Sequence, residues 1–501
     1  MEDNHGREPR DGDYYADPTF QGVEQTLAHG SPPNESQGEA PAAQPFSNHI
    51  KATFVLGGPL VAAQVAQMLI TVTDTVMLGW LGTDELAAGS LAFQFVFIFH
   101  IFGLGIGAAM MPLIASALGR GDEQAVRRST RMGFWVLIAV STVFLLPLSL
   151  VEPLLVHGLG QSPKLAALAD EYMVFAMWAL VPMFLLSGQR AFFSSLEWAK
   201  TVLALTVFAA LLNAALNYGL IFGNFGLPRM EMAGAGLATV IANVLVICLG
   251  FLIMARAEAF RAYALFERVW RPDWAALKEI SFLALPISLT IFAEAGLFSA
   301  ASVMIGWIGT VPLAAHAIVL QLASLTFMIP MGLAQAGSVR VGRAYGRGSV
   351  VDIGRAGWAT FVISVAFAFV AGIVFFLVPE PLIALFLDDD NVDAAAVIAF
   401  GIPLLWVAAA FQLVDAGQAV AAGSLRGLKD TRVPMQIAVV SYWAIGVPVA
   451  YGLAFFADWG AVGVWTGLAS GLFAAAVLLN LRFLRREPLG LVTFTATSRK
   501  R

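Results

Sequence analysis

Three carboxylates lie inside apolar stretches of this chain, where a charge is expensive to bury. They are Asp74 in LITVTDTVMLG, Glu294 in LTIFAEAGLFSA and Asp415 in AAFQLVDAGQAVAA. On insertion scales a charge at the centre of a bilayer costs at least about 2.5–3.5 kcal/mol, so an acid there needs a function or a partner. We expect no Lys or Arg in the interior of these helices. A buried carboxylate without a basic partner must be protonated or hold a cation, which are the two states that a coupling ion requires.

Each acid also has a simpler interpretation, in which it only makes hydrogen bonds. Asp74 lies close to the expected end of its helix, and Gln412 and Gln418 flank Asp415 in the sequence. Glu294 has apolar and small neighbours on both sides, which leave it without an obvious partner. We therefore predict that Glu294 and Asp415 carry cation or proton coupling, and that Asp74 is a third coupling residue.

Other polar and aromatic side chains in the apolar stretches form a second set of candidates. A hydrogen bond or a packing contact between helices explains each one alone, yet together they could line a path for a substrate. The predicted pathway residues are Gln67, Gln94, Asn213, Asn217, His316, Gln321, Phe411 and Gln412. Tyr218 and Gln335 are further polar positions, and His100 is expected to pack or hydrogen bond rather than to relay protons.

The elements that must hold these residues follow from composition. The chain is 58% hydrophobic and 13% charged, whereas a soluble domain usually carries about 25% charged residues. Many apolar runs span about 20 residues, the length that crosses a bilayer core as a helix. We predict an all-α membrane protein with twelve transmembrane helices. They are expected at 52–78, 87–115, 130–154, 167–189, 200–223, 233–255, 280–305, 313–339, 356–380, 395–422, 434–457 and 461–481.

The two halves of the chain repeat one another. MLGWLGTDELAA at 77–88 matches MIGWIGTVPLAA at 304–315, with eight of twelve residues identical. The same offset of 227 residues pairs Gly119 with Gly346, and it pairs Glu294 with Gln67, so this acid breaks the internal symmetry. Because each half has an even number of helices, we predict two parallel, pseudo-symmetric six-helix lobes. Transporters built from such repeats place substrate and ion sites near the membrane midplane between the repeats.

The placement of basic residues predicts the orientation in the membrane. If the N-terminus is cytoplasmic, 27 of the 29 Lys and Arg residues fall on the cytoplasmic side, and only Lys164 and Arg229 fall on the other. Lys and Arg accumulate in cytoplasmic loops, so we expect both termini to be cytoplasmic. The predicted layout is a disordered cytoplasmic N-terminal tail (1–50), an N-lobe (51–255), a cytoplasmic linker (256–279), a C-lobe (280–484) and a cytoplasmic C-terminal tail (485–501).

Several function classes find no support in the sequence. GLGIGA at 103–108 lacks the spacing of a dinucleotide-binding loop and lies in an expected membrane helix, and no Walker motif is present. Cys248 is the only cysteine, which excludes an intramolecular disulfide and a cysteine metal cluster. The net charge of −5 argues against nucleic acid as a partner. We predict that the protein is not an enzyme and has no cofactor.

Four longer segments make the chain resemble a known family. They are DTVMLGWLGTDELAAGSLA, LNAALNYGLIFGNFGLP, AAHAIVLQLASLTFMIPMGLAQAGSVRVGRAYG and, most specifically, FQLVDAGQAVAAGSLRGLKDT. The chain is similar to the multidrug and toxic compound extrusion (MATE) family in its NorM-like branch, over about residues 50 to 485.

The resemblance implies export of organic, mostly cationic or amphipathic drugs by antiport with Na⁺ or H⁺ through alternating access. It implies that Glu294 and Asp415 form a cation site in the C-lobe, with Na⁺ as a candidate ligand. It also implies that Asp74 couples cations or protons in the N-lobe. In one respect the chain departs from the pattern. The family site can include a Tyr one turn before the second acid, where this chain has Phe411. That departure leaves the choice between Na⁺ and H⁺ open.

Two other functions remain as alternatives. A flippase for lipid-linked precursors, from the same superfamily, would be expected to hold pyrophosphate with basic residues in its cavity, and we expect none in the helix interiors here. A scaffold or channel without coupled transport is the second. We further expect a monomer in a bacterial inner membrane, in contact with membrane lipid, with both termini in the cytoplasm.

Overall fold

Twelve apolar helices run through the part of the chain that the computed structural model describes, which is residues 45–158, 160, 162–267, 269–387 and 393–492. Each is long and apolar enough to cross a membrane. They occur in the predicted order, so the prediction of an all-α membrane protein with twelve transmembrane helices is confirmed.

The first six spans belong to the N-lobe. They are α2 (Phe46–Leu81), α3 (Thr83–Arg120), α4 (Glu123–Leu148), the pair α6 (Pro163–Ala176) and α7 (Leu180–Ser195) joined by η2 (Met177–Ala179), α8 (Ala199–Phe222) and α9 (Glu231–Arg256). Short pieces α5 (Val151–Pro153) and η1 (Leu154–Gly158) follow α4, and η3 (Glu258–Tyr263) follows α9.

The second six spans belong to the C-lobe. They are α10 (Trp274–Ile308), α11 (Thr310–Gly346), α12 (Val350–Leu377), α14 (Ala394–Gly427), a segment made of α15 (Arg432–Val439), η4 (Val440–Gly446), α16 (Val447–Tyr451) and η5 (Gly452–Phe456), and α17 (Gly460–Leu484). Helix α13 (Pro379–Ala384) is a short piece before α14.

Most helices are longer than hydropathy predicts, because their polar ends continue beyond the apolar part. Helix α10 begins at Trp274 rather than at 280, and the Asp273 side chain caps it by accepting a hydrogen bond from the Ala276 amide. That bond and a second one from Arg128 hold the pKa of Asp273 below its usual value. Helix α2 already begins at Phe46, inside the predicted N-terminal tail. The rest of that tail, residues 1–44, lies outside the described residues.

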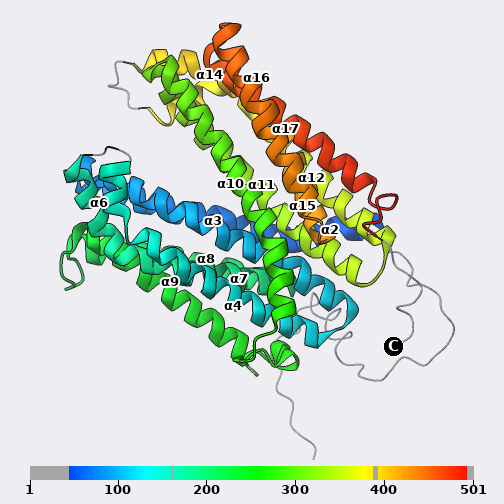
Figure 1. Cartoon of the computed structure of the whole chain (residues 1–501). Coiled ribbons are helices and arrows are strands. Elements are labelled where there is room, and N and C mark those ends of the chain that lie inside the picture. The colour runs from blue at the N-terminus through cyan, green and yellow to red at the C-terminus, as the bar shows by residue number, and fades with distance from the viewer. Residues whose placement is uncertain (1–44, 159, 161, 268, 388–392, 493–501) are drawn as a thin grey trace, which may run out of the picture. The chain divides into compact units, whose positions relative to one another are not determined.

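The internal repeat is visible in the backbone. Gly82 ends α2 with φ 163° and ψ 170°, and Gly309 ends α10 with φ 159° and ψ 169°. These glycines are 227 residues apart, which is the offset found in the sequence. In Figure 1 the blue-to-green helices form one bundle and the green-to-red helices form a second. The prediction of two parallel, pseudo-symmetric six-helix lobes is confirmed.

The lobes touch through α2 and α3 on one side and α10 and α11 on the other. Two glycines that the repeat relates, Gly119 and Gly346, face one another in this junction. A Cβ atom on Gly119 would lie 3.0 Å from the Gly346 Cα, and one on Gly346 would lie 2.9 Å from the Gly119 Cα. This contact lies at the helix ends that carry Arg120 and Arg343, which we call the basic end.

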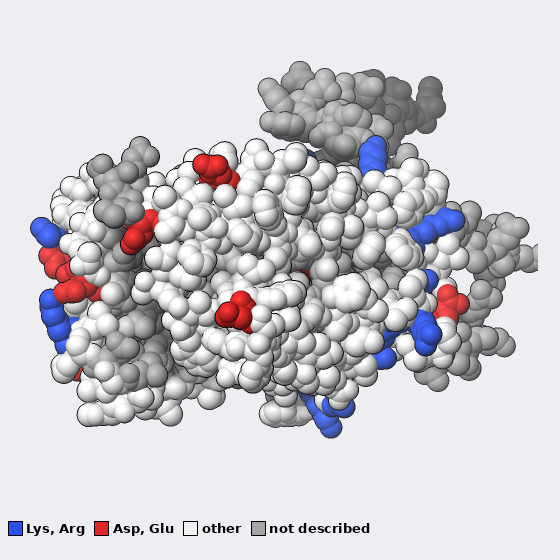
Figure 2. All heavy atoms as spheres, turned by 90° about the horizontal axis from the view of Figure 1, so that it is seen from above, with Lys and Arg blue, Asp and Glu red and all other residues white. Residues whose placement is uncertain are grey.

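Charged side chains are sparse between the two ends of the bundle. Figure 2 shows one face on which most Lys and Arg gather towards the ends and the broad band between them is mostly white. Large apolar side chains are exposed along the helices in that band, among them Leu146, Val207, Phe369 and Leu478. A wide apolar belt between charged ends is what a membrane-spanning protein presents to lipid.

Candidate functional site

Asp415 is the most deeply buried of the three acids. It lies in the middle of α14 with an exposed fraction of 3%. Its Oδ1 atom has no hydrogen-bond partner among the described residues. A buried carboxylate oxygen without a donor is costly, so this atom is available to a proton or a bound cation.

Glu294 and Asp415 act on one another, because their carboxylates interact electrostatically across α10 and α14. The structure therefore brings the two predicted coupling residues together. Arg426, in the last turn of α14, also interacts with Glu294. The apolar and small neighbours of Glu294 in the sequence give no sign of this basic partner. Hydropathy placed Arg426 in a loop, whereas α14 continues to Gly427.

Tyr442 brings a phenol to the two acids. It is fully buried in η4, and its side chain interacts electrostatically with Glu294 and with Asp415. The segment η4 has π-helical geometry, and single π-turns inside helices occur often at functional sites. The next residue, Trp443, donates a hydrogen bond from Nε1 to the Ala293 carbonyl at 3.2 Å, which fixes η4 against α10 beside Glu294.

The two glutamines beside Asp415 do not satisfy it. Gln418 donates its Nε2 hydrogen to the Tyr442 hydroxyl oxygen, and Gln412 donates to the Ala323 carbonyl at 3.3 Å. The simpler interpretation of Asp415, in which these amides complete its hydrogen bonds, is therefore wrong. Gln418 instead bonds to the Tyr442 hydroxyl.

Phe411 and His316 belong to a packed group around Trp465. The Phe411 ring packs edge-on against Trp465, with 5.6 Å between ring centroids. Trp465 donates its indole hydrogen to Nδ1 of His316 at 3.1 Å, and Nε2 of His316 lies 3.0 Å from the Ser302 hydroxyl. Because Nδ1 accepts a hydrogen bond, the proton of the neutral imidazole is on Nε2. These contacts pack α14 against α17, while a role of His316 and Phe411 in a substrate path stays a prediction.

Asp74 lies in a separate polar group in the N-lobe. Asn217 donates from Nδ2 to the Asp74 carboxylate at 2.6 Å, and to Asn213 Oδ1 at 3.2 Å. Both amides are almost fully buried on α8, one turn apart. Tyr172 interacts electrostatically with the same carboxylate. The structure thus brings Asp74, a predicted coupling residue, together with Asn213 and Asn217, two predicted pathway residues.

A second N-lobe group surrounds Arg190, which the sequence placed in a loop. It lies in α7, five residues before the helix end, and donates from Nη2 to Gln67 on α2 and to the Thr206 hydroxyl on α8 at 3.2 Å. His100 interacts electrostatically with Arg190, and its Nδ1 atom is buried without a partner among the described residues. The expectation that no Arg lies in a helix interior is therefore wrong.

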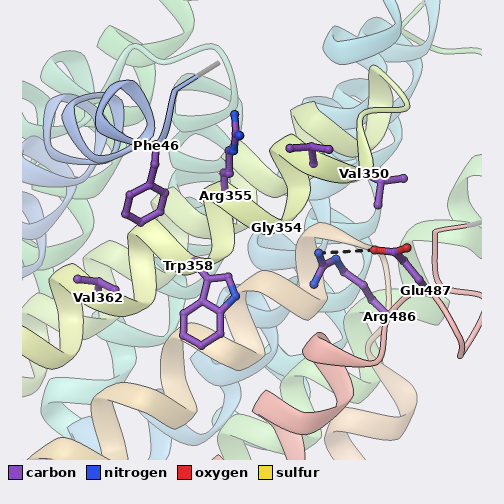
Figure 3. Close-up of a pocket in the computed structure, with 9 residues that line it drawn as sticks. Phe46, Val350, Gly354, Arg355, Trp358, Val362, Arg486 and Glu487 are labelled. Carbon is purple, nitrogen blue, oxygen red and sulfur yellow. Dashed lines mark ion pairs between the residues drawn. The ribbon is translucent and has the colours of Figure 1, made fainter. Parts of the chain in front are cut away.

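The remaining predicted pathway residues are not part of either group. Gln94 on α3 and Gln321 on α11 are exposed. An open hollow of about 470 Å³ lies at the basic end, between the start of α2, α12 and the segment after α17 (Figure 3). Its lining includes Arg355, Trp358 and Arg486 but none of the three acids. We therefore do not place the transport site there.

A family model named MatE matches residues 59–219 and 286–452, one block in each lobe. The chain belongs to the MatE family. The resemblance to NorM-like transporters is confirmed, and the protein is a multi-pass integral membrane protein. It is 48% identical to a probable multidrug resistance protein NorM of Rhizobium meliloti (strain 1021), over 88% of this chain and 94% of that protein. It is 39% identical to the NorM protein of Pseudomonas aeruginosa, over 88% and 90% of the two chains.

Solved structures of MATE transporters share the fold of this chain. One, described as an outward-facing conformation of a multidrug resistance MATE family transporter, has a TM-score of 0.79 at 20% identity and covers 89% of this chain and 97% of that one. A second, a MATE transporter in the bent conformation, has a TM-score of 0.80 at 18% identity and covers 90% and 98%. At these identities the likeness concerns the fold alone.

Proposed function

We propose that this MATE protein is a secondary active exporter that moves organic, mostly cationic or amphipathic drugs outward by antiport with Na⁺ or H⁺. The observation that carries the proposal is the pair of interacting carboxylates Glu294 and Asp415, with one buried oxygen left without a donor. The NorM relatives are named as multidrug resistance proteins, which supports drugs as the substrates. No separate cofactor is needed, because the ion gradient supplies the energy.

In this proposal one set of carboxylates serves two cations in turn. The coupling ion enters from outside and binds at Glu294 and Asp415, with the Tyr442 hydroxyl as a further oxygen. Its binding cancels the negative charge that attracts the drug, so the drug leaves outward. Each net charge that moves inward per cycle, beyond the charge of the exported drug, releases about 2.3 kcal/mol per 100 mV. That energy sustains a drug gradient of roughly fifty-fold, since about 1.36 kcal/mol is tenfold.

Alternating access requires contacts that close one end of the space between the lobes. At the basic end Arg343 of α11 reaches Glu197, with 2.8 Å from Nη1 to Oε1, and donates to the Ser195 carbonyl at 2.9 Å. Nearby, Arg340 of α11 donates to Thr53 and to the His49 carbonyl of α2. We propose that these bonds between lobes hold the basic end closed while the drug is released at the other end.

Replacing Arg343 by Ala is expected to open the basic end. The variant loses a charge-assisted hydrogen bond between lobes, worth about 1.5–3 kcal/mol, and a half-exposed ion pair, worth up to about 1 kcal/mol. We therefore expect the closed state to lose about tenfold or more in population relative to the open state. Spin-label distances across the lobes at this end test it, on a background without the exposed Cys248. The control is Arg261→Ala, because among the described residues Arg261 pairs only with Glu258, three residues away. An unchanged distance distribution in Arg343→Ala would contradict the proposed closure.

We propose that both termini are cytoplasmic, in a bacterial inner membrane, and that the protein works as a monomer. The orientation rests on the basic residues, 27 of 29 on one side. Cysteines introduced at residue 2 or residue 498 are expected to resist a membrane-impermeant maleimide in intact cells and to react in inverted vesicles. Labelling of either site from outside would overturn the orientation.

A lipid-linked-precursor flippase is a second candidate, because Arg190 places a basic group inside a helix, where it could bind pyrophosphate. Efflux from proteoliposomes separates the two functions. We expect ion-driven export of ethidium and no movement of a fluorescent lipid-linked pyrophosphate. The reverse result would favour the flippase.

A further inference from the structure

Arg190 is a cation inside the N-lobe without a carboxylate beside it. Its Nη2 donates to two neutral groups, the Gln67 side-chain carbonyl and the Thr206 hydroxyl. Among the residues that the structure describes, these two bonds are the only hydrogen bonds of the Arg190 side chain, and its guanidinium has no ion pair. A charged group within a membrane-spanning region is costly unless an opposite charge meets it.

The guanidinium points into the bundle and not towards the nearby helix end. Arg190 lies five residues from the end of α7, close enough for its side chain to extend to the polar boundary. It instead reaches Gln67, which lies in the middle of α2, 21 residues from its start. The direction of the side chain therefore favours a role inside the membrane over simple solvation at the surface.

Gln67 is on the face of α2 that meets the other lobe. One turn earlier on the same face, Gln64 donates to Met331 of α11 at 2.6 Å, and Val61 packs against Gly332. Gln67 itself is exposed, so it lies just beyond the layer where the lobes touch. The Arg190–Gln67 pair thus borders the space between the lobes.

The internal repeat relates this pair to the acids of the C-lobe. Gln67 and Glu294 occupy equivalent positions, 227 residues apart, on helices that run in the same direction. Glu294 also lies beyond the contact layer, which on α10 includes Ser288 against Gly105. At equivalent positions the C-lobe therefore has the carboxylate of Glu294, and the N-lobe has the neutral amide of Gln67. The Gln67 amide oxygen accepts a hydrogen bond from the Arg190 guanidinium.

We propose that Arg190, positioned by Gln67 and Thr206, binds the carboxylate of zwitterionic substrates whose amine is held at Glu294 and Asp415. This inference rests on the proposed export function and names the residue that would bind the acidic group of those substrates that carry one. A guanidinium with two unused donors suits a carboxylate, which accepts two parallel hydrogen bonds. A pyrophosphate carries more charge and calls for more basic groups than this one arginine.

Two dyes that differ at one group test the proposal. Rhodamine 110 carries a free carboxyl group, and rhodamine 123 is its methyl ester. Dissociation constants are measured by fluorescence polarisation with the purified full-length protein. In Arg190→Gln we expect binding of rhodamine 110 to weaken about tenfold or more, as for the loss of a charge-assisted hydrogen bond, and binding of rhodamine 123 to stay unchanged. The matched control is Arg261→Gln, an exposed arginine outside the membrane helices.

Each result separates this inference from the export function. Equal loss for both dyes, or loss for neither, overturns the carboxylate site. If the wild-type protein binds rhodamine 123 but not rhodamine 110, the carboxylate site is overturned and cation export still stands. If it binds neither dye, both the carboxylate site and the export function are contradicted. If Arg190→Gln does not accumulate, the proposal is tested by adding sodium benzoate as a competitor to the wild-type protein. It is expected to compete with rhodamine 110 and not with rhodamine 123, and an equal effect or none on the two dyes overturns the proposal.

Discussion

Glu294→Gln is expected to abolish ion-driven drug efflux while the protein stays in the membrane. Glutamine keeps the shape and hydrogen bonding of glutamate but cannot release a proton or neutralise Na⁺. Without one coupled charge, the drug gradient falls by roughly fifty-fold at 100 mV. Arg426 loses an electrostatic partner in this variant. It lies in the last turn of α14, where the helix dipole favours a cation, so we expect folding to survive.

Asp415→Asn is expected to behave in the same way, because the two carboxylates form one interacting pair. The measurement is gradient-driven efflux of ethidium at matched membrane abundance. Glu258→Gln is the matched control, since this carboxylate is exposed at the basic end and, within the described part of the chain, pairs only with Arg261. Wild-type efflux from both Glu294→Gln and Asp415→Asn would show that the coupling is elsewhere and would direct attention to Asp74.

Gly119→Leu and Gly346→Leu are expected to stop transport for a different reason. A Cβ atom on Gly119 would lie 2.3 Å from the Arg343 carbonyl oxygen, and one on Gly346 would lie 2.1 Å from that of Ser116. These are backbone atoms of the opposite lobe and cannot move aside without separating the lobes. Overpacking of this kind costs about 1–3 kcal/mol or more. We therefore expect each variant to hold the basic end open.

The readout is the spin-label distance at the basic end together with efflux at matched abundance. Gly58→Leu is the control, because a Cβ atom there meets nothing within 4 Å and the residue is exposed on α2. Both glycine variants should show longer distances between lobes and little efflux. Normal efflux from either one would mean that close contact of α3 with α11 is not required for transport.

The number of membrane spans and the division into two lobes could be predicted from sequence. Apolar length predicted the twelve spans, and the 227-residue offset predicted the two lobes, since both signals extend over many residues. Helix ends were less predictable. Hydropathy marks only the apolar part, so Arg190 and Arg426 were taken for loop residues although α7 and α14 continue past them. The turn after α7 has positive φ at Glu197 rather than at a glycine, which left no sequence signal.

The acids themselves were predictable because a carboxylate in an apolar run is conspicuous. Their surroundings were not, because those come from residues distant in the chain. Tyr442 reaches Glu294 and Asp415 from a π-helical segment that periodicity does not reveal, and Gln418 bonds to it rather than to its neighbour Asp415. The sequence identifies Asn217 as a polar residue inside an apolar helix. Only the packing of α8 on α2 shows that it donates a hydrogen bond to the Asp74 carboxylate.

Ion movement in proteoliposomes that contain the pure protein tests the central claim most directly. Ethidium is added on one side without an imposed gradient, and the opposite movement of Na⁺ and H⁺ is recorded with ion-sensitive dyes. We predict that the drug drives one of these ions across the membrane in the wild-type protein, and that Glu294→Gln abolishes the movement. Drug flux that continues unchanged when both ion gradients are dissipated, with no ion movement in either direction, would contradict the assignment of this protein as an antiporter.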